Sequence, residues 1–351
     1  MQPLSRPMPV AAEILDALPN GTDPFALSLN ENPFPPLPAV RSALIRSIDV
    51  ANRYPEFLPE RLRRLIAGHV GVRDEQVVLG AGASGVVMQV LHAVTRPGDR
   101  IVVSEPTFDG YPIFAQMARL TSVTVPLDKR GHHDLEAMVE AAANASVVVL
   151  CRPHNPTGTL EPVADVHRFL RRVPDDTVVL LDEAYIEFVA PQHRIDGPEL
   201  IRRFPNVVVL RTFSKAYGLA GLRIGYGFAS PELARTVWGM QLPFGMGITS
   251  LTAVAASYDA QDQLRQRILR ITGERDYLSR RLRAKGVYTT DGHANFVYLP
   301  AVWLPWREVF GDTGLKARYY PDGAARITVG GRASTQAVLA AVAKSPGWER
   351  S

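Results

Sequence analysis

Short apolar runs recur through the middle of the chain, separated by stretches long enough to form helices. The runs lie near residues 77–79, 101–103, 122–125, 147–151, 178–181 and 207–210. Strands that alternate with helix-length segments are typical of a mostly parallel sheet covered by helices. The pattern therefore predicts an α/β fold whose ligands bind at the ends of the strands.

The C-terminal part of the chain follows a different order of elements. We expect a long amphipathic helix near 262–285, strands at Val287–Thr290 and Asn295–Leu299, and a final helix from Ser334 to Lys344. These elements predict a smaller α+β domain, joined to the rest near Pro243–Gly247.

The length also indicates two domains, because 351 residues exceed a comfortable single core. We expect a large domain over residues 46–245 and a small domain formed by residues 1–45 and 246–351. The proline-rich segment Asn32–Pro38 is interpreted as an ordered arm that crosses the active site.

Composition and charge narrow the class of protein. Apolar residues make up 46% and charged residues 21%, and the net charge is +4. The basic clusters at Glu60–Arg64 and Arg280–Arg283 recur at helical spacing beside acidic residues, so they indicate solvated helix faces and not a nucleic-acid site. No apolar run reaches the length of about 18 residues that a membrane span needs.

The histidines, the cysteine and the N-terminal segment favour neither a metal site nor an oxidising compartment. His132 and His133 have no second cluster at ligand spacing, so we expect no metal. The single Cys151 rules out an intramolecular disulfide and reads as an inert core thiol. Met1–Pro9 has three prolines and no apolar segment typical of a secretory signal. We therefore expect a cytoplasmic enzyme.

The most informative chemistry lies between Arg211 and Gly227, directly after the apolar run Asn206–Leu210. That run brings Ser214 and Lys215 to the end of a core strand, where a poorly solvated lysine favours its neutral amine. A neutral amine can form a Schiff base with an aldehyde. An isolated Ser-Lys pair would usually be a surface feature, so the neighbouring segments decide its meaning.

Three other segments offer groups that suit pyridoxal phosphate. Val178–Tyr185 is an apolar strand that ends in Asp182, whose carboxylate can pair with a protonated pyridine nitrogen. Val147–Gly158 runs into the turn Asn155–Gly158, where Asn155 can donate to a ring oxygen. Val77–Gly85 leads from a strand into small residues and a helix-like run, Val86–Thr95, which is typical of a phosphate cradle.

A dinucleotide-binding enzyme is the alternative of another class. Gly80, Gly82 and Gly85 fit G-x-G-x-x-G, and Glu105 follows twenty residues later at a strand end. An NAD-dependent oxidoreductase of this kind leaves the groups at Asp182 and Lys215 unexplained.

Six segments in order carry a resemblance to a known family. They cover the chain from about residue 25 to 335 and are Leu27–Pro33, Asn52–Pro55, Asn155–Gly158, Asp182–Tyr185, Arg211–Gly227 and Ala325–Gly330. The chain resembles the fold-type I pyridoxal phosphate aminotransferases, within the histidinol-phosphate and aromatic aminotransferase group. The resemblance implies a large domain with a mostly parallel seven-stranded sheet and a smaller α+β domain.

The resemblance also implies a role for each matching residue. Lys215 would carry the internal aldimine and move the proton between Cα and C4′, and Asp182 would keep the pyridine nitrogen protonated. Asn155 and Tyr185 would bond the ring oxygen, and Phe108 would stack on the ring. The phosphate would be held by Ala83, Ser84, Ser214 and Arg223, and by Tyr54 of the neighbouring subunit. Asn30, Arg318 and Arg326 would lie at the substrate, with Arg326 on its carboxylate.

Several of these residues have a purely structural alternative. Phe108 and Tyr185 could be ordinary core residues, and Arg326 could be a solvated residue of an alternating strand. The turn Tyr319–Gly323 blurs the alignment of Arg318. Asp182 and Lys215 are the best-supported members of the set.

The reaction implied is transamination by a homodimer, with Lys215, Asp182 and Tyr185 as its catalytic residues. Ser84-Gly85 stands where histidinol-phosphate enzymes usually carry an acidic pair, and Ala17–Gly21 lacks a tyrosine that they tend to have. We therefore expect phenylalanine or tyrosine as donor and 2-oxoglutarate as acceptor. Histidinol phosphate, a specialised biosynthetic amino acid and a decarboxylation reaction stay open as alternatives.

Overall fold

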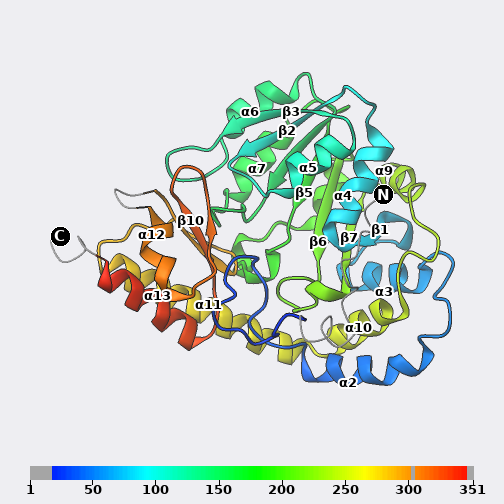
Figure 1. Cartoon of the computed structure of the whole chain (residues 1–351). Helices are drawn as coiled ribbons and strands as arrows, with labels where there is room; N and C mark the ends of the chain where they lie inside the picture. The colour runs from blue at the N-terminus through cyan, green and yellow to red at the C-terminus, as the bar shows by residue number, and fades with distance from the viewer. Residues whose placement is uncertain (1–17, 302–304, 346–351) are drawn as a thin grey trace, which may run out of the picture.

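The computed structural model describes residues 18–301 and 305–345 and contains two β-sheets of unequal size (Figure 1). The larger sheet has seven strands in the order β1-β7-β6-β5-β4-β2-β3, and the smaller has three in the order β8-β10-β9. Helices flank the large sheet on both sides. The predicted α/β class and the mostly parallel seven-stranded sheet are confirmed.

The strands of the large sheet include all six apolar runs identified in the sequence. They are β1 (Val77–Ala81), β2 (Arg100–Glu105), β3 (Thr121–Pro126), β4 (Val147–Cys151), β5 (Val178–Asp182), β6 (Val207–Thr212) and β7 (Ile224–Ala229). Strands β3, β2, β4, β5 and β6 run parallel, whereas β7 pairs antiparallel with both β6 and β1. Asp182 is the last residue of β5, and Cys151 is the last residue of β4. Both therefore lie at the carboxyl edge of the sheet, where open α/β sheets bind their ligands.

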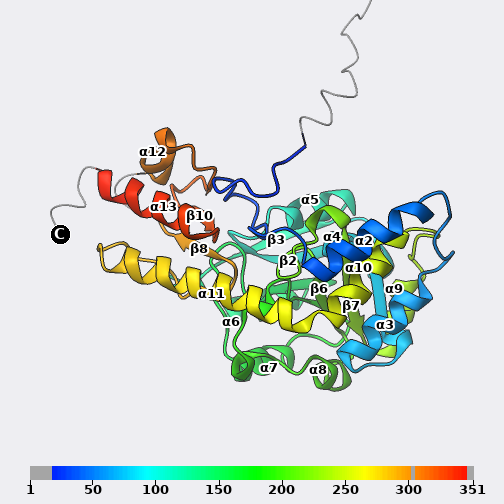
Figure 2. The same cartoon turned by 90° about the horizontal axis from the view of Figure 1, so that it is seen from below.

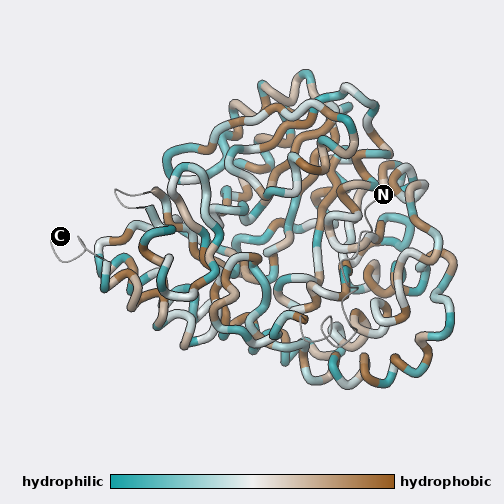
Figure 3. The backbone as a smooth tube through the Cα atoms, viewed as in Figure 1, coloured by the Kyte–Doolittle hydropathy of each residue, from teal (hydrophilic) through white to brown (hydrophobic). Residues whose placement is uncertain are grey.

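Successive residues of the central strands are buried on opposite faces. On β6, Val207 and Val209 join one apolar cluster, and Val208 and Leu210 join another. The first cluster lies under α3 (Glu60–Val70), α6 (Leu135–Ala142), α7 (Val163–Leu170) and α8 (Gly197–Arg203), and the second lies under α4 (Gly82–Val94), α5 (Gly110–Met117) and α9 (Pro231–Trp238). Figure 3 shows the hydrophobic chain concentrated in these strands, with hydrophilic segments outside.

Side-chain caps fix where three of these helices begin. Asp134, Asp196 and Ser230 accept hydrogen bonds from backbone N–H groups in the first turns of α6, α8 and α9. Helix α4 begins at Gly82, four residues before the helix-like run expected at Val86. Gly82 has a φ of 74°, a backbone conformation that residues with a side chain rarely adopt. The glycine therefore lets the chain turn directly from β1 into the helix.

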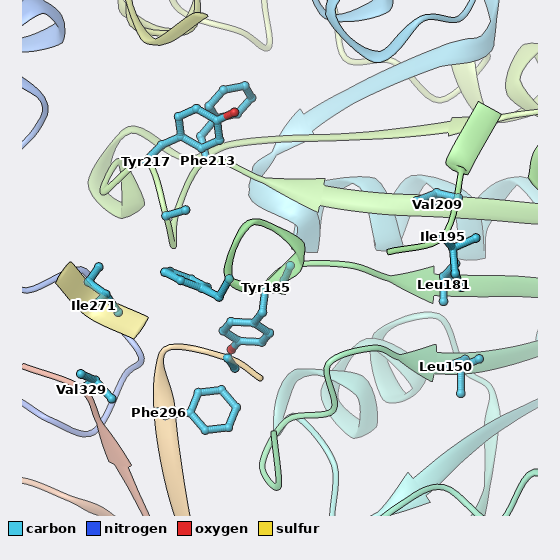
Figure 4. Close-up of a cluster of buried hydrophobic side chains, with 14 of the residues drawn as sticks. Leu150, Leu181, Tyr185, Ile195, Val209, Phe213, Tyr217, Ile271, Phe296 and Val329 are labelled. Atoms are coloured by element: carbon cyan, nitrogen blue, oxygen red, sulfur yellow. The ribbon is translucent and has the colours of Figure 1, made fainter. Parts of the chain in front are cut away.

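The smaller sheet packs against three helices at one end of the molecule (Figure 2). Its strands are β8 (Phe296–Leu299), β9 (Arg318–Tyr319) and β10 (Ala325–Thr328), and its helices are α11 (Gln261–Arg283), α12 (Trp306–Phe310) and α13 (Arg332–Lys344). Helix α11 contacts α13 and β8 at one end and α10 (Ile248–Asp259) at the other. Figure 4 shows Tyr185, in the chain that follows β5, beside Phe296 of β8; the centroids of the two rings are 5.2 Å apart. The two parts therefore share one continuous core.

Most predictions for the C-terminal part are confirmed, but one strand is wrong. The long helix, the strand near 295–299 and the final helix correspond to α11, β8 and α13. Residues 287–290 form no strand. Hydrogen bonds that involve side chains hold this segment, and it pairs with no neighbouring strand. The Arg283 guanidinium donates to the carbonyl oxygens of Thr289 and Thr290, and the Thr290 hydroxyl donates to Thr157 O.

The segment before α2 (Pro38–Ser47) runs from the small sheet to the carboxyl edge of the large one. The Leu27 N–H donates to Lys316 O, and Leu27 O accepts from the Thr328 N–H. Further along the segment, Asn32 Nδ2 donates to the carbonyl oxygens of Lys215 and Ala216. These bonds hold the segment across the site, as expected for the proline-rich arm.

Short 3₁₀ helices complete the described chain: η1 (Ile48–Val50), η2 (Asp74–Gln76), η3 (Ile186–Phe188), η4 (Pro191–His193), η5 (Ala220–Leu222) and η6 (Gly311–Thr313). Within the described residues, no helix is long and apolar enough to cross a membrane.

The division into domains stays a prediction. The boundary expected after residue 45 falls inside α2, which packs against α10. Residues 1–17, 302–304 and 346–351 of the expected small domain lie outside the described residues, as does Ala17 of the segment Ala17–Gly21.

Candidate active site

A cavity of about 360 Å³ opens at the carboxyl edge of the large sheet, between that sheet, the small sheet and the N-terminal segment. Every predicted site residue except Tyr54 lines it. They are Asn30, Ala83, Ser84, Phe108, Asn155, Asp182, Tyr185, Ser214, Lys215, Arg223, Arg318 and Arg326. The volume lies in the range of small-molecule sites.

Lys215 follows β6, at the turn where the chain leaves the sheet. Its Nζ donates to Leu29 O at 3.1 Å and lies 5.8 Å from the centre of the Tyr185 ring. Burial, together with the nearby charge of Arg326, lowers the pKa of Lys215 to about 8. The lowered pKa increases the unprotonated share of the amine near neutral pH, the form that a nucleophile or a general base requires.

Asp182 ends β5 and is buried beneath the cavity. Burial raises the pKa of Asp182, and hydrogen bonds to its carboxylate oppose that rise. Tyr111 Oη donates to Oδ2 at 2.6 Å, and the Ala184 N–H donates to Oδ1 at 2.9 Å. These donors favour the charged form of a carboxylate that has left water.

Tyr111 is a cavity residue that the sequence did not indicate. It lies on α5, three residues after Phe108, and the two rings meet edge to face with centroids 5.8 Å apart. Its position three residues after Phe108 was the one feature of the sequence that could have indicated a place in the site. Its hydrogen-bond partner Asp182 is 71 residues away, so no local pattern connects the two.

The other end of the cavity is built from the start of α4 and the chain around Arg223. The Arg223 guanidinium donates to Ala220 O and Ala81 O, at 3.0 and 3.4 Å. A Cβ at Gly82 would come within 2.3 Å of Arg223 Nη2, so the glycine makes room for this side chain. A guanidinium, free N–H groups at a helix start and the hydroxyls of Ser84 and Ser214 suit a phosphate.

Two side-chain pairs close the cavity on the side of the small sheet. Asn30 Nδ2 donates to Tyr185 Oη at 3.0 Å. Arg326 on β10 donates to Asn155 Oδ1 and to Ser28 O. Arg326 is only 6% exposed, and its Nε has no hydrogen-bond partner among the described residues. A buried guanidinium with a free donor suits an incoming carboxylate.

Phe108 and Arg318 both line the cavity. A Cβ at Gly110 would lie 2.4 Å from the Phe108 ring, so that glycine allows the ring its position. Arg318 on β9 pairs with Asp109 at 2.9 Å, and Asp109 also lines the cavity.

Tyr54 does not reach this cavity. It is 83% exposed, and its ring lies tilted against that of Phe244, with ring centroids 4.9 Å apart. The contribution expected from Tyr54 of a neighbouring subunit stays a prediction.

The groups present fit a pyridine ring that carries a phosphate and an aldehyde. An anion cradle, a carboxylate and an amine of lowered pKa stand in one cavity, and the orphaned Arg326 Nε offers a place for a substrate carboxylate. The dinucleotide alternative does not fit, because β7, β6, β5 and β4 separate β1 from β2 in the sheet. Gly80 and Gly85 instead pack against each other.

Comparisons with known proteins agree with this chemistry. A family model described as aminotransferase class I and II matches residues 22–302. An aromatic amino acid aminotransferase of Cutibacterium acnes is 40% identical over 329 residues, which cover 93% of this chain and 94% of that protein. The enzyme of the same name from Streptomyces coelicolor is 38% identical over 314 residues, covering 89% and 88%.

A solved structure gives the same result at the level of the fold. The histidinol-phosphate aminotransferase of Sinorhizobium meliloti, in complex with pyridoxal-5′-phosphate, superposes with a TM-score of 0.83 and 28% identity, covering 90% of this chain and 89% of that one. The L-threonine-O-3-phosphate decarboxylase of Porphyromonas gingivalis has a TM-score of 0.74 at 22% identity, covers 86% and 96%, and shares the fold.

Proposed function

The chain belongs to the class I and II aminotransferase family, and we propose that it transfers the amino group of an aromatic amino acid to 2-oxoglutarate with pyridoxal phosphate as cofactor. One observation carries the proposal: a single cavity holds an amine of lowered pKa, a buried carboxylate and a buried guanidinium. Lys215, Asp182 and Arg326 supply these groups. The names of the Cutibacterium and Streptomyces relatives support the aromatic donor.

The cavity residues divide between the parts of the cofactor. Asp182 would accept a hydrogen bond from the pyridine nitrogen, and Asn155 and Tyr185 would bond the ring oxygen. Phe108 would cover the ring, and the phosphate would be held by Ala83, Ser84, Ser214 and Arg223. When bound, pyridoxal phosphate supplies an electron sink for the charge left at Cα when its proton departs.

Two residues would then act on the substrate itself. Arg326 would bind its carboxylate in a two-pronged contact and so fix the position of Cα. Lys215 Nζ would accept the Cα proton and return it, because a pKa of about 8 leaves the amine able both to take and to give a proton near neutral pH. Asn30 would hold the arm against Tyr185 over the site.

The aromatic donor is supported by the walls of the cavity. Leu29, Phe108, Phe114 and, on α4, Val87 line it with apolar surface. A large uncharged side chain would bury its surface there. Histidinol phosphate is the second candidate, because the solved Sinorhizobium meliloti enzyme of that name shares the fold at 28% identity.

The test is a half-reaction screen on purified protein loaded with pyridoxal phosphate. Phenylalanine, tyrosine and histidinol phosphate are added singly, and loss of the visible absorbance of the bound cofactor is followed. We expect rapid loss with phenylalanine or tyrosine. Loss with histidinol phosphate alone would contradict the aromatic donor, and a protein that stays colourless with added pyridoxal phosphate would contradict the cofactor.

Two controls separate neighbouring possibilities. Release of CO₂ without any need for an oxo acid would indicate a decarboxylase. Lys215→Ala should remove the visible absorbance that depends on the lysine, and its persistence would show that another residue holds the cofactor.

The expected assembly is a homodimer with shared active sites. Tyr54, Phe57 and Phe244 form an exposed aromatic cluster, with Phe57 and Phe244 edge to face at 5.1 Å. Exposed apolar groups gathered in this way favour burial against a second copy. Tyr54 would then reach the phosphate of the partner's cofactor. We also propose a cytoplasmic location, because a single buried cysteine suits a reducing compartment.

A further inference from the structure

Two arginines of the small sheet stand side by side at the cavity. Arg318 on β9 and Arg326 on β10 are directly opposite in the antiparallel register, and both line the cavity. Residues opposite each other in such a ladder have neighbouring side chains, and like charges there destabilise the sheet. The arrangement therefore needs a separate partner for each guanidinium.

The partners that the two arginines have are of different kinds. Arg326 is buried and bonds only neutral oxygens, those of Asn155 and Ser28, so it keeps its full charge for a ligand. Arg318 instead pairs with the carboxylate of Asp109, which cancels its charge. In the protein without substrate, one arginine is uncompensated and the other is neutralised from within the chain.

Asp109 has no evident structural task apart from this pair. It is the residue before α5, a position where a carboxylate often caps the helix, yet its side chain makes no capping hydrogen bond. Its Oδ1 accepts from Arg318 Nη2 at 2.9 Å, across 209 residues of sequence. The pair thus links the segment before α5 to strand β9 of the small sheet at the cavity.

An aminotransferase must accept two unlike side chains in one cavity. The donor proposed above carries an uncharged ring, whereas 2-oxoglutarate carries a second carboxylate. We propose that Asp109 determines this dual specificity: its carboxylate neutralises Arg318 when an uncharged side chain is bound, and it releases Arg318 to the distal carboxylate of a dicarboxylic acceptor. The proposal rests on the proposed aminotransferase function and deepens it.

The exposure of the pair makes such an exchange feasible. The side chains of Arg318 and Asp109 are 44% and 55% exposed, so water competes for both and the pair is weak. The Arg211–Glu183 pair shows the contrasting case, with exposures of 19% and 0%, and a buried pair of that kind is costly to separate. Of these two pairs, the half-exposed one can exchange its partner for a ligand at the lower cost.

The test measures binding of two acids that the enzyme cannot convert. Glutarate has a distal carboxylate, and 3-phenylpropionate has a ring in its place. Isothermal titration calorimetry gives the dissociation constant of each for holoenzyme and variants. In Asp109→Asn, the freed Arg318 should bind glutarate roughly fivefold more tightly, a change of the size expected when a half-exposed ion pair is removed. The affinity for 3-phenylpropionate should not rise.

Two further variants complete the design. Arg318→Met should weaken glutarate binding and spare 3-phenylpropionate. Asp262→Asn removes an equivalent charge from the ion pair with Arg265 on α11, where the aspartate side chain is 89% exposed, and should change neither affinity. In the half-reaction with glutamate, Asp109→Asn should lower KM and leave kcat unchanged.

Three outcomes would overturn the proposal. They are an unchanged glutarate affinity in Asp109→Asn, an equal gain for both acids, and a glutarate affinity that does not depend on Arg318. If neither acid binds the wild-type holoenzyme, the proposed function fails as well, so the two failures are distinguishable.

Discussion

At the active-site lysine, burial and a neighbouring arginine act in the same direction. Both disfavour the ammonium form, and the pKa of Lys215 falls from 10.5 to about 8. Between about pH 8 and 10.5, the lysine is mostly protonated in the unfolded chain and mostly neutral in the folded chain. Below about pH 8 the folded chain must hold the ammonium form that its surroundings disfavour. Function at this residue is therefore obtained at a cost in stability.

Lys215→Met should stabilise the cofactor-free protein. At pH 7 we expect the free energy of unfolding to rise by roughly 1–3 kcal/mol. The penalty that the variant removes is complete below about pH 8, declines between about 8 and 10.5, and is absent above that range. Urea unfolding at several pH values measures the difference. Lys316→Met, at an exposed lysine paired with Asp23, should show no such gain.

Tyr111→Phe tests the hydrogen bond to the buried carboxylate. This bond lowers the pKa of Asp182 against the effect of burial, so its loss should raise that pKa further. Pyridoxal phosphate should then bind about tenfold more weakly at pH 6, with a smaller loss at pH 8. Fluorescence titration of the apoprotein at both pH values measures the effect. An equal loss at both would contradict an effect through Asp182, and Tyr277→Phe on α11 is the control.

Residues such as Tyr111 and Asp109 show why part of the site could not be predicted. The sequence identified groups whose chemistry is recognisable within a short segment, such as Lys215 after its strand. Tyr111 and Asp109 acquire a role only through partners 71 and 209 residues away. Such contacts depend on how the strands are ordered and how the small sheet is placed, which local patterns do not specify.

At the level of elements, strands could be predicted where apolar or β-branched residues form a continuous run, as in β4 and β6. Strand β7, with the sequence IGYGFA, was not identified because alternate glycines interrupt its apolar pattern. Those glycines have a structural reason, since a Cβ at Gly225 would lie 2.2 Å from Gly82 C and Ala83 N. The close approach of β7 sets the position of the expected phosphate cradle.

Two glycine-to-alanine changes should therefore have opposite effects. Gly225→Ala would push β7 away from the start of α4, so we expect a loss of about 1–3 kcal/mol in stability and weaker pyridoxal phosphate binding. Gly273 lies inside α11 with no atom within 4 Å of an added Cβ. Gly273→Ala should gain roughly 0.5–1 kcal/mol by favouring the helix. Thermal unfolding compares the two, and a tolerated Gly225→Ala would contradict the packing argument.

At the scale of the whole molecule, one surface has more apolar exposure than a monomer would need. The turn that follows α9 presents Leu242 and Phe244 beside Tyr54 and Phe57, and Phe244 N donates to Phe57 O at 2.8 Å. This turn lies in the same region as α2 and α10 and apart from the small sheet (Figure 1). A second copy that covers it would also bring Tyr54 toward another cavity.

Leu242→Lys should separate the expected homodimer without damaging the fold. The Leu242 side chain is 66% exposed, so the variant loses little within its own chain but places a charge in the interface. Leu269→Lys is the matched control, because Leu269 is 65% exposed on α11. Sedimentation velocity should show a dimer for the wild type and for Leu269→Lys, and a monomer for Leu242→Lys. If Tyr54 acts across the interface, the monomer should also bind pyridoxal phosphate more weakly while its unfolding stays cooperative. A fully active monomer would contradict shared active sites, because the groups within one chain would then suffice.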